Sequence, residues 1–255
     1  MATQQGDHQA GDQKHFRPAL IVVDMQEDFC PPNGSLAVTD GRTIAPTINA
    51  LLTLPFVLKV GTKDWHPPDH ISFASNHAYA EPHESSAQIE NPADSSETVD
   101  IMLWPDHCVQ GTDGAELIPE LDTQLLNAVV LKGTDRRVEM YSAFADVFGN
   151  KADPGPGSST RQGEVEGSLE VLLARANVSH VYVVGLAADY CVLYTALDSA
   201  KAGFKTFVVE EATRAVDSGE ESLGRARKKW SDAGVDVISM KGKEVDWIRM
   251  LEGGA

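Results

Sequence analysis

One short stretch, "KDWHPPDHISF" at Lys63–Phe73, places a carboxylate and two imidazoles close together, at Asp64, His66 and His70. Carboxylates and imidazoles in such a cluster are common ligands of zinc, iron and manganese. The alternative is a polar loop in which Asp64 and the two prolines form turns. A metal site would need a further ligand from elsewhere in the chain, and "LWPDHCV" supplies His107.

These residues predict a site for one divalent metal ion. Asp64, His66 and His107 would hold the ion and leave coordination positions open for water or substrate. We predict zinc, with iron or manganese as alternatives. His70 is either a fourth ligand or a residue that supports the ligands, and we favour the second role.

A second set of residues could carry out nucleophilic chemistry. Cys191 begins a predicted helix, where the positive end of the helix dipole favours a thiolate and lowers the thiol pKa. A lysine such as Lys132 would lower it further if it lay nearby. An aspartate such as Asp24 could accept the thiol proton if its surroundings raised its proton affinity. Cys191, Asp24 and Lys132 thus form a candidate nucleophile, base and electrostatic tuner.

Each of these residues also has a structural explanation. Asp24 could cap a turn, and Lys132 could be an exposed lysine at a sheet edge. Cys191 could be a small buried apolar residue, the usual role of a free cysteine, which we expect of Cys30 and Cys108. Their shared position at predicted strand ends favours chemistry.

The elements that would position these residues alternate between strand and helix. Six short apolar runs rich in β-branched residues predict strands buried on both faces of a parallel sheet: Ala19–Met25, Phe56–Asp64, Asn127–Gly133, His180–Ala187, Lys205–Ala212 and Val235–Met240. Helices are predicted between them, at about Arg42–Leu54, Gly167–Ala176, Ala188–Ala202 and Gly219–Ala233. This alternation predicts an α/β fold, with a mainly parallel six-stranded sheet and helices on both faces.

Ligands of open parallel sheets bind at the carboxyl ends of the strands. The candidate residues at or just after those ends should therefore converge on one crevice: Asp24, Asp64, His66, Lys132 and Cys191. We expect residues 1–17 to be a disordered lead and residues 18–255 to form a single domain. Two long polar segments, 74–100 and 150–164, are predicted to be loops that act as lids or mobile insertions.

Composition limits the class of partner. The chain has 21 basic and 38 acidic residues, a formal net charge of −17, which repels nucleic acids and anionic membranes. No apolar run approaches the ~20 residues that span a bilayer, and the N-terminus lacks the apolar core of a secretory signal. Three scattered cysteines favour a reducing compartment. We expect a cytoplasmic protein, with the nucleus and the peroxisome left open.

Longer motifs resemble a known family. The stretches "ALIVVDMQEDFCPPNGSLAV", "DWHPPDHISF", "LWPDHCVQGTDGAEL", "LKGTDRRVEMYSAF" and "VVGLAADYCVLYTALDSAKAGFKT" are similar to those of nicotinamidases, members of the isochorismatase-like cysteine hydrolases. They follow the family's order across roughly Ala19–Ala212. The long segment 74–100 resembles fungal members more than bacterial ones.

The resemblance implies roles for individual residues. Asp24, Lys132 and Cys191 would be the catalytic triad. The metal ligands would be those proposed above, and Phe29, Trp104 and Tyr141 would line the pyridine pocket. A non-proline cis peptide is implied at Leu186–Ala187, and the N–H groups of Ala187 and Cys191 would form an oxyanion hole.

The resemblance also implies an activity, the metal-dependent hydrolysis of nicotinamide to nicotinate and ammonia in NAD salvage, through a thioester on Cys191. Nicotinamide would be the small-molecule partner, and the sequence leaves a homo-oligomer open. One alternative is a hydrolase of another small amide. Another is a metal-centred, oxygenase-like enzyme that uses the two-His-one-Asp site and in which Cys191 is inert. A third is a binding protein without catalysis.

Overall fold

The computed structural model describes residues 16–151, 164–166 and 169–251. Most of the expected N-terminal lead, 1–17, and most of the expected loop, 150–164, lie outside these residues.

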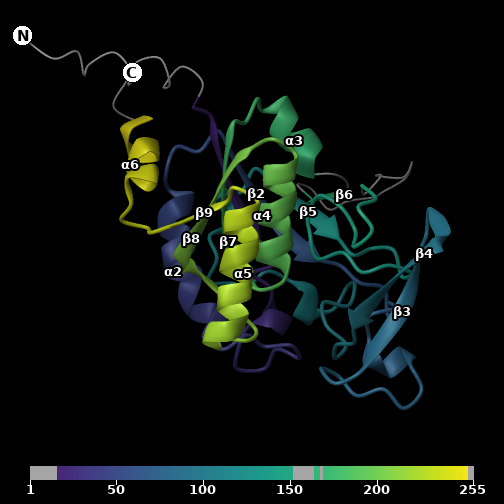
Figure 1. Ribbon diagram of the computed structural model, residues 1–255. Helices are drawn as coiled ribbons and strands as arrows, with labels where there is room; N and C mark the ends of the chain where they lie inside the picture. Colours follow the sequence, from purple (N-terminus) through teal and green to yellow (C-terminus); the bar gives the residue numbers. More distant parts are fainter. Residues whose placement is uncertain (1–15, 152–163, 167–168, 252–255) are drawn as a thin grey trace, which may run out of the picture.

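A parallel sheet forms the centre of the molecule (Figure 1). In chain order its strands are β1 (Pro18–Val23), β2 (Leu58–Asp64), β5 (Ala128–Lys132), β6 (Glu164–Glu166), β7 (His180–Leu186), β8 (Lys205–Arg214) and β9 (Asp236–Ile238). They lie side by side in the order β6-β5-β2-β1-β7-β8-β9, and each pair is parallel. All six predicted strands are present, and the short strand β6 extends the sheet beyond β5.

Helices cover both faces of the sheet, as the sequence predicted. The α-helices are α2 (Ala45–Leu52), α3 (Leu169–Arg175), α4 (Cys191–Lys201), α5 (Glu220–Asp232) and α6 (Lys243–Arg249). Short 3-10 helices are η2 (Glu27–Phe29), η3 (Gly41–Ile44), η4 (Ala74–Asn76), η5 (Asp113–Ala115) and η6 (Thr123–Leu125). The first four α-helices fall in the predicted ranges, and α6 was not predicted.

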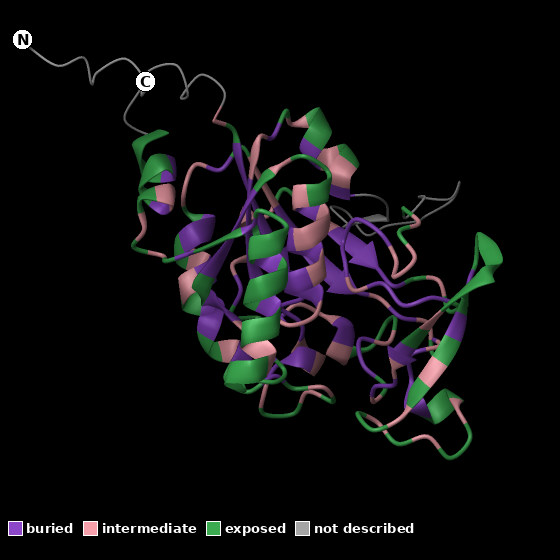
Figure 2. Ribbon diagram, in the orientation of Figure 1, coloured by how far each residue is buried: buried purple, intermediate pink, exposed green. Residues whose placement is uncertain are grey.

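Alternate residues of the central strands point into two separate cores. Leu20 and Val22 of β1 pack with α2 and α6, whereas Ala19, Ile21 and Val23 pack with α3, α4 and α5. Every residue of β1 is buried, in keeping with its place in the middle of the sheet (Figure 2). A strand buried on both faces reads as a continuous apolar run, which is why the sequence pattern identified it.

The expectation of a loop over 74–100 is wrong for its second half. Strands β3 (Ser86–Asn91) and β4 (Asp94–Met102) form an antiparallel hairpin beside the main sheet (Figure 1). Only Ile89 and Ile101 of the hairpin are buried apolar residues, and they pack against Val138. The remaining side chains are mostly polar and exposed, so no apolar alternation marks the strands in the sequence.

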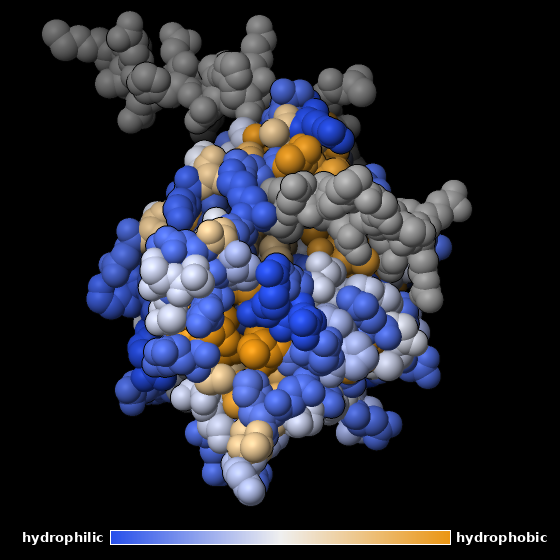
Figure 3. Space-filling view, turned by 90° about the vertical axis from the view of Figure 1, so that its right-hand side faces the viewer, coloured by the Kyte–Doolittle hydropathy of each residue, from blue (hydrophilic) through white to orange (hydrophobic). Residues whose placement is uncertain are grey.

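The surface agrees with the acidic, polar composition. The side that carries the β3–β4 hairpin is largely hydrophilic, with hydrophobic residues gathered in small patches near its middle and near its top (Figure 3). Among the described residues, no helix has the length and apolar character needed to cross a membrane.

Candidate active site

Four neighbouring strands deliver the site. Asp24 directly follows β1, Asp64 ends β2, Lys132 ends β5, and the chain after β7 leads to Cys191 at the first position of α4. Because β5, β2, β1 and β7 are adjacent and parallel, their carboxyl ends meet at one edge of the sheet. The predicted candidates therefore lie together.

Lys132 lies at the centre of this group and is fully buried. Its Nζ atom is 2.9 Å from Oδ2 of Asp24 and 3.4 Å from Sγ of Cys191. The ammonium also forms an ion pair with Oδ1 of Asp64 and donates a hydrogen bond to the carbonyl oxygen of Met140. One cation thus contacts two carboxylates and a thiol.

The two carboxylates differ in proton affinity. Burial raises the pKa of Asp24 above its usual value, although the Lys132 ammonium opposes this. Burial also acts to raise the pKa of Asp64, but Lys132 and His66 outweigh it and hold that pKa well below its usual range. Asp24 is therefore the better proton acceptor of the pair. Burial acts to lower the pKa of Lys132, but Asp24 and Asp64 hold it well above its ordinary value.

The thiol of Cys191 differs from the expectation of a lowered pKa. Burial raises the pKa of Cys191 well above its ordinary value, and this effect outweighs the favourable charge of Lys132. Burial thus disfavours the thiolate, and a base that accepts the thiol proton would offset this effect. Asp24 is in position to do so, because its carboxylate lies within 4.8 Å of the Cys191 sulfur.

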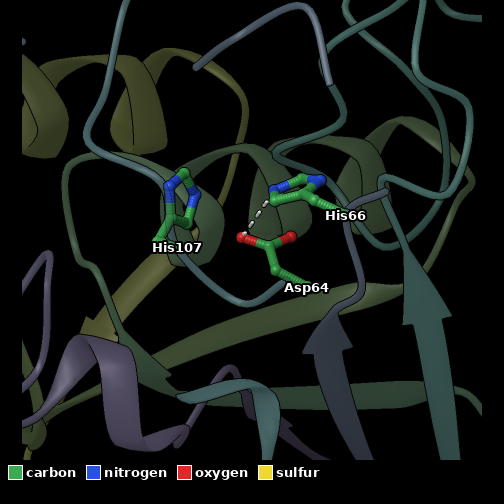
Figure 4. A group of neighbouring side chains, drawn as sticks. All are labelled: Asp64, His66 and His107. Atoms are coloured by element: carbon green, nitrogen blue, oxygen red, sulfur yellow. Dashed lines mark ion pairs between the residues drawn. The ribbon is translucent and has the colours of Figure 1, made fainter. Parts of the chain in front are cut away.

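A set of metal-ligand atoms lies beside this group (Figure 4). Ligand atoms of Asp64, His66 and His107 lie within 4.8 Å of one another. His66 donates its Nδ1–H to the carbonyl oxygen of Gly133 at 2.8 Å, and His107 donates its Nδ1–H to that of Pro105 at 2.7 Å. Both imidazoles thus keep a lone pair on Nε2 for a metal.

His66 supplies a direct test of that fit. Its Nε2 atom is buried and has no hydrogen-bond partner among the described residues, and it lies 3.7 Å from Oδ2 of Asp64. A buried nitrogen without a partner is costly, and a metal ion would satisfy it. Two imidazoles and one carboxylate form a donor set that suits zinc, iron or manganese.

His70 is placed beside the ligands rather than among them. Its Nδ1 accepts a hydrogen bond from the Ser72 hydroxyl at 2.8 Å, and its Nε2 donates one to the carbonyl oxygen of Val138 at 3.2 Å. The ring lies 4.0 Å from that of His66, centre to centre. Both nitrogens of His70 are thus occupied, and its contact with His66 is between the two rings.

An aromatic pocket opens onto Cys191 and two of the three candidate metal ligands. The four residues predicted to contact substrate all line it, together with Asp64, His107 and Cys191: Phe29, Trp104, Tyr141 and Ala187. Trp104 donates its indole N–H to the Tyr141 hydroxyl at 3.3 Å. Flat aromatic walls beside a nucleophile and a polar metal site fit a small planar amide.

The backbone around Cys191 offers free donors. The Leu186–Ala187 peptide is cis, as the resemblance implied. Within the part of the chain that the structure describes, no acceptor pairs with the N–H groups of Ala187 or Cys191. Both residues line the pocket, so these N–H groups are available to a developing oxyanion.

Two polar residues of the site were missed in the sequence. Glu139 is buried and lines the pocket, and burial raises the pKa of its carboxyl group. Gln26 donates a side-chain amide N–H to the carbonyl oxygen of Asp64 and accepts the backbone N–H of the same residue, both at 2.8 Å. These two bonds hold the backbone of Asp64 in place. The sequence marks Glu139 only as a charged residue between two apolar ones, Val138 and Met140, in "RRVEMYSAF".

Comparison with known proteins gives the class. The sequence profile of the isochorismatase domain matches residues 18–241. The chain therefore belongs to the isochorismatase family.

Its relatives include several nicotinamidases. The nicotinamidase of Acinetobacter baylyi is 39% identical over 223 residues, which cover 88% of this chain and 92% of the relative. A structure of the yeast nicotinamidase with the inhibitor nicotinaldehyde has 32% identity and a TM-score of 0.76, covering 87% of this chain and 99% of the other. The pyrazinamidase of Pyrococcus horikoshii, in complex with zinc, has 30% identity and a TM-score of 0.63, covering 88% and 99%.

These relatives come from Acinetobacter baylyi, yeast and Pyrococcus horikoshii. They leave the fungal-type resemblance of the segment 74–100 as a prediction.

Proposed function

We propose that the protein is a nicotinamidase, a metal-dependent cysteine amidohydrolase that converts nicotinamide and water to nicotinate and ammonia. One observation carries this proposal: Lys132 contacts Asp24, Cys191 and the candidate metal ligand Asp64, and the last two residues line a single aromatic pocket. The names of the relatives support the same activity.

The first step forms a thioester. Asp24 accepts the proton of the Cys191 thiol, and the sulfur attacks the carboxamide carbon of nicotinamide. The N–H groups of Ala187 and Cys191 hold the oxyanion that forms on the carbonyl oxygen. Lys132 stabilises the thiolate as it develops, because its ammonium is 3.4 Å from the sulfur.

The second step releases the acid. Asp24 returns its proton to the leaving amine, so that the carbon–nitrogen bond breaks and ammonia departs. A water molecule then gives a proton to Asp24 and attacks the thioester carbon. The carbon–sulfur bond breaks, Cys191 regains a proton, and nicotinate leaves.

The remaining residues bind and orient the substrate. Phe29, Trp104 and Tyr141 would pack around the flat pyridine ring. A divalent ion held by the side chains of Asp64, His66 and His107 would supply a Lewis-acid contact for the ring nitrogen. Zinc is the ion we propose, supported by the zinc complex of the pyrazinamidase relative.

The test is ammonia release from nicotinamide by the purified protein and by Cys191→Ala. We expect the variant to lose turnover by a factor of at least ~10³, since the nucleophile is removed. Cys30→Ala is the matched control, because Cys30 is also buried but packs in the core beside α2. A Cys191→Ala protein that keeps most of the activity would instead favour metal-centred chemistry.

Benzamide tests substrate recognition. It carries the same carboxamide but no ring nitrogen, so its kcat/KM should be about 10²–10³-fold lower. His66→Ala should reduce turnover of nicotinamide more than that of benzamide. Equal losses for both substrates would contradict a role for the metal site in holding the ring.

A further inference from the structure

A second cavity, of about 340 Å³, adjoins the active-site pocket. The two spaces share Trp104, Tyr190 and Val216 as lining residues. The cavity is also lined by residues of α4 and α5, by Met102 at the end of β4 and by His83, which precedes β3. We call this cavity the side groove. None of the steps proposed above uses it.

Aromatic rings form the wall between groove and pocket. The Trp104 ring meets Tyr190 edge to face, with ring centres 5.0 Å apart, and it meets His83 in the same way at 5.4 Å. Tyr194 adds a further ring to the groove lining. Such walls favour a planar ligand, because aromatic rings pack well edge to face or offset.

Helix α5 adds two cations to the groove, Arg225 and Lys229, one helical turn apart. Arg225 pairs with Glu221 at 2.7 Å, but both side chains are largely exposed and the pair is therefore weak. Lys229 has no carboxylate within ion-pair distance among the described residues, and its Nζ lies 5.6 Å from the centre of the Tyr194 ring. A cation is thus available beside an aromatic wall.

Two acidic residues also line the groove, and both are engaged by the backbone. Asp189 accepts the N–H groups of Val216 and Asp217, each at 2.9 Å, through its two carboxylate oxygens. Asp217 in turn accepts the N–H of Gly219 at 2.9 Å. These bonds direct both carboxylates toward the loop that precedes α5.

From this arrangement we propose that the side groove binds aromatic monocarboxylates, with the ring against Trp104, Tyr190 and Tyr194 and the carboxylate toward Lys229 and Arg225. The product of the proposed function, nicotinate, is such an anion and forms in the adjoining pocket; its identity as the natural ligand rests on that proposed function. A chain with a net charge of −17 repels anions overall. Of the four charged residues that line the groove, only Lys229 and Arg225 attract the carboxylate of the product, while Asp189 and Asp217 face the backbone N–H groups before α5.

The experiment uses benzoate as the probe. Its binding to the full-length protein is measured by ligand-observed NMR titration at low salt. Benzoate has the ring and the carboxylate but no ring nitrogen. The variants below leave Asp64, His66 and His107 unchanged, so any benzoate that binds at the metal site contributes equally to parent and variants. Benzamide is the neutral comparison. We expect Lys229→Glu to weaken benzoate binding at least tenfold and to leave benzamide binding within twofold of the parent.

Lys228→Glu is the matched control. Lys228 lies on the same helix, is exposed and pairs with Asp232 at 2.6 Å, and it does not line the groove. Both variants change the net charge equally, so a loss confined to Lys229→Glu supports the groove. An equal loss in both variants, or a loss in neither, would overturn the proposal. Lys229→Gln, which adds no negative charge, should show a smaller loss in the same direction.

This titration is independent of turnover. If ammonia release from nicotinamide fails while benzoate binding depends on Lys229, the proposed activity is wrong and the groove stands. If ammonia is released and benzoate binding ignores Lys229, the groove proposal is wrong and the activity stands.

Discussion

The charge on Lys132 is shared by two carboxylates and a thiol, and each of these groups comes from a different strand end or helix start. The surroundings of Asp24 and Asp64 drive their pKa values in opposite directions, although both carboxylates contact the same ammonium. Two chemically identical side chains that share one cation are therefore suited to different tasks. Asp24 is suited to accept a proton, and Asp64 is suited to stay ionised as a metal ligand.

Replacing Lys132 by Met should therefore disturb both the acceptance of a proton by Asp24 and the ionised state of Asp64. We expect turnover to fall and the pH profile of Cys191 alkylation by iodoacetamide to move to higher pH, because a neighbouring cation lowers the thiol pKa and its removal raises it. Loss of one partner from a buried ion pair should also reduce the free energy of unfolding by about 3–5 kcal/mol. Lys63→Met is the control, since Lys63 is a buried lysine that pairs with Glu116 outside the site. An unchanged alkylation profile would contradict the role of Lys132.

The histidines make a prediction about metal content. His66→Ala should lose bound metal on dialysis, because it removes a nitrogen that no other described group satisfies. His70→Phe should keep one ion per chain, because both nitrogens of His70 are occupied by Ser72 and Val138. Any weakening in His70→Phe should stay within the 10–100-fold range known for residues that support ligands. Atomic emission after dialysis measures the metal content of both variants. Complete loss of metal from His70→Phe would make His70 a ligand.

At the scale of elements, the turn after β5 positions His66 from outside its own strand. Gly133 has a positive φ of 64°, and its carbonyl accepts the His66 Nδ1–H. A Cβ atom added to Gly133 would lie 2.4 Å from Cε1 of the His66 ring. The glycine is thus required both by its backbone conformation and by the imidazole beside it.

Gly133→Ala should displace the His66 ring and lower metal affinity by about 10–100-fold. The free energy of unfolding should also fall, by about 1–3 kcal/mol, because alanine is strained at positive φ. Gly149→Ala is the control: Gly149 has a φ of 87° and no atom within 4 Å of an added Cβ. It shares the backbone strain but not the collision. Equal metal affinity in both variants would show that the contact with His66 does not matter.

The elements also show how far the sequence could predict the structure. Buried parallel strands such as β1 and β7 were predicted because they are continuous apolar runs, and the position of Asp24 and Cys191 after them followed from the topology. The hairpin was missed because its strands expose most of their side chains. Helix α6 was missed because it is only one short segment near the end of the described chain.

Residues outside regular elements were harder to place. Glu139 lies in a segment without helix or strand, so its approach to the pocket depends on tertiary packing that no local pattern encodes. Gln26 likewise reaches Asp64 across neighbouring strand ends. The pKa of Cys191 was misjudged because its helix position is visible in the sequence, whereas the extent of its burial is not.

At the scale of the whole molecule, the net charge of −17 works against the compact state. Raising NaCl from about 10 mM to about 150 mM should screen this repulsion. We expect a gain of about 1 kcal/mol in the free energy of unfolding, or about 2–4 °C in Tm for a chain of this length. Differential scanning fluorimetry measures the change. Sodium sulfate at equal ionic strength separates screening from surface exclusion, and a Tm that falls with salt would contradict the expectation.

The β3–β4 hairpin has a further consequence for protein engineering. Its tip at residues 92–93 is exposed. The flanking residues Asn91 and Asp94 are paired across the hairpin, so the two points at which an insert would be joined lie close together. The tip belongs to the separate two-stranded sheet and not to the parallel sheet. A small folded domain whose own ends lie close together could be spliced in there without separating the strands. The hairpin thus offers an internal fusion point, at which a fluorescent or affinity module could be carried on an otherwise unaltered enzyme.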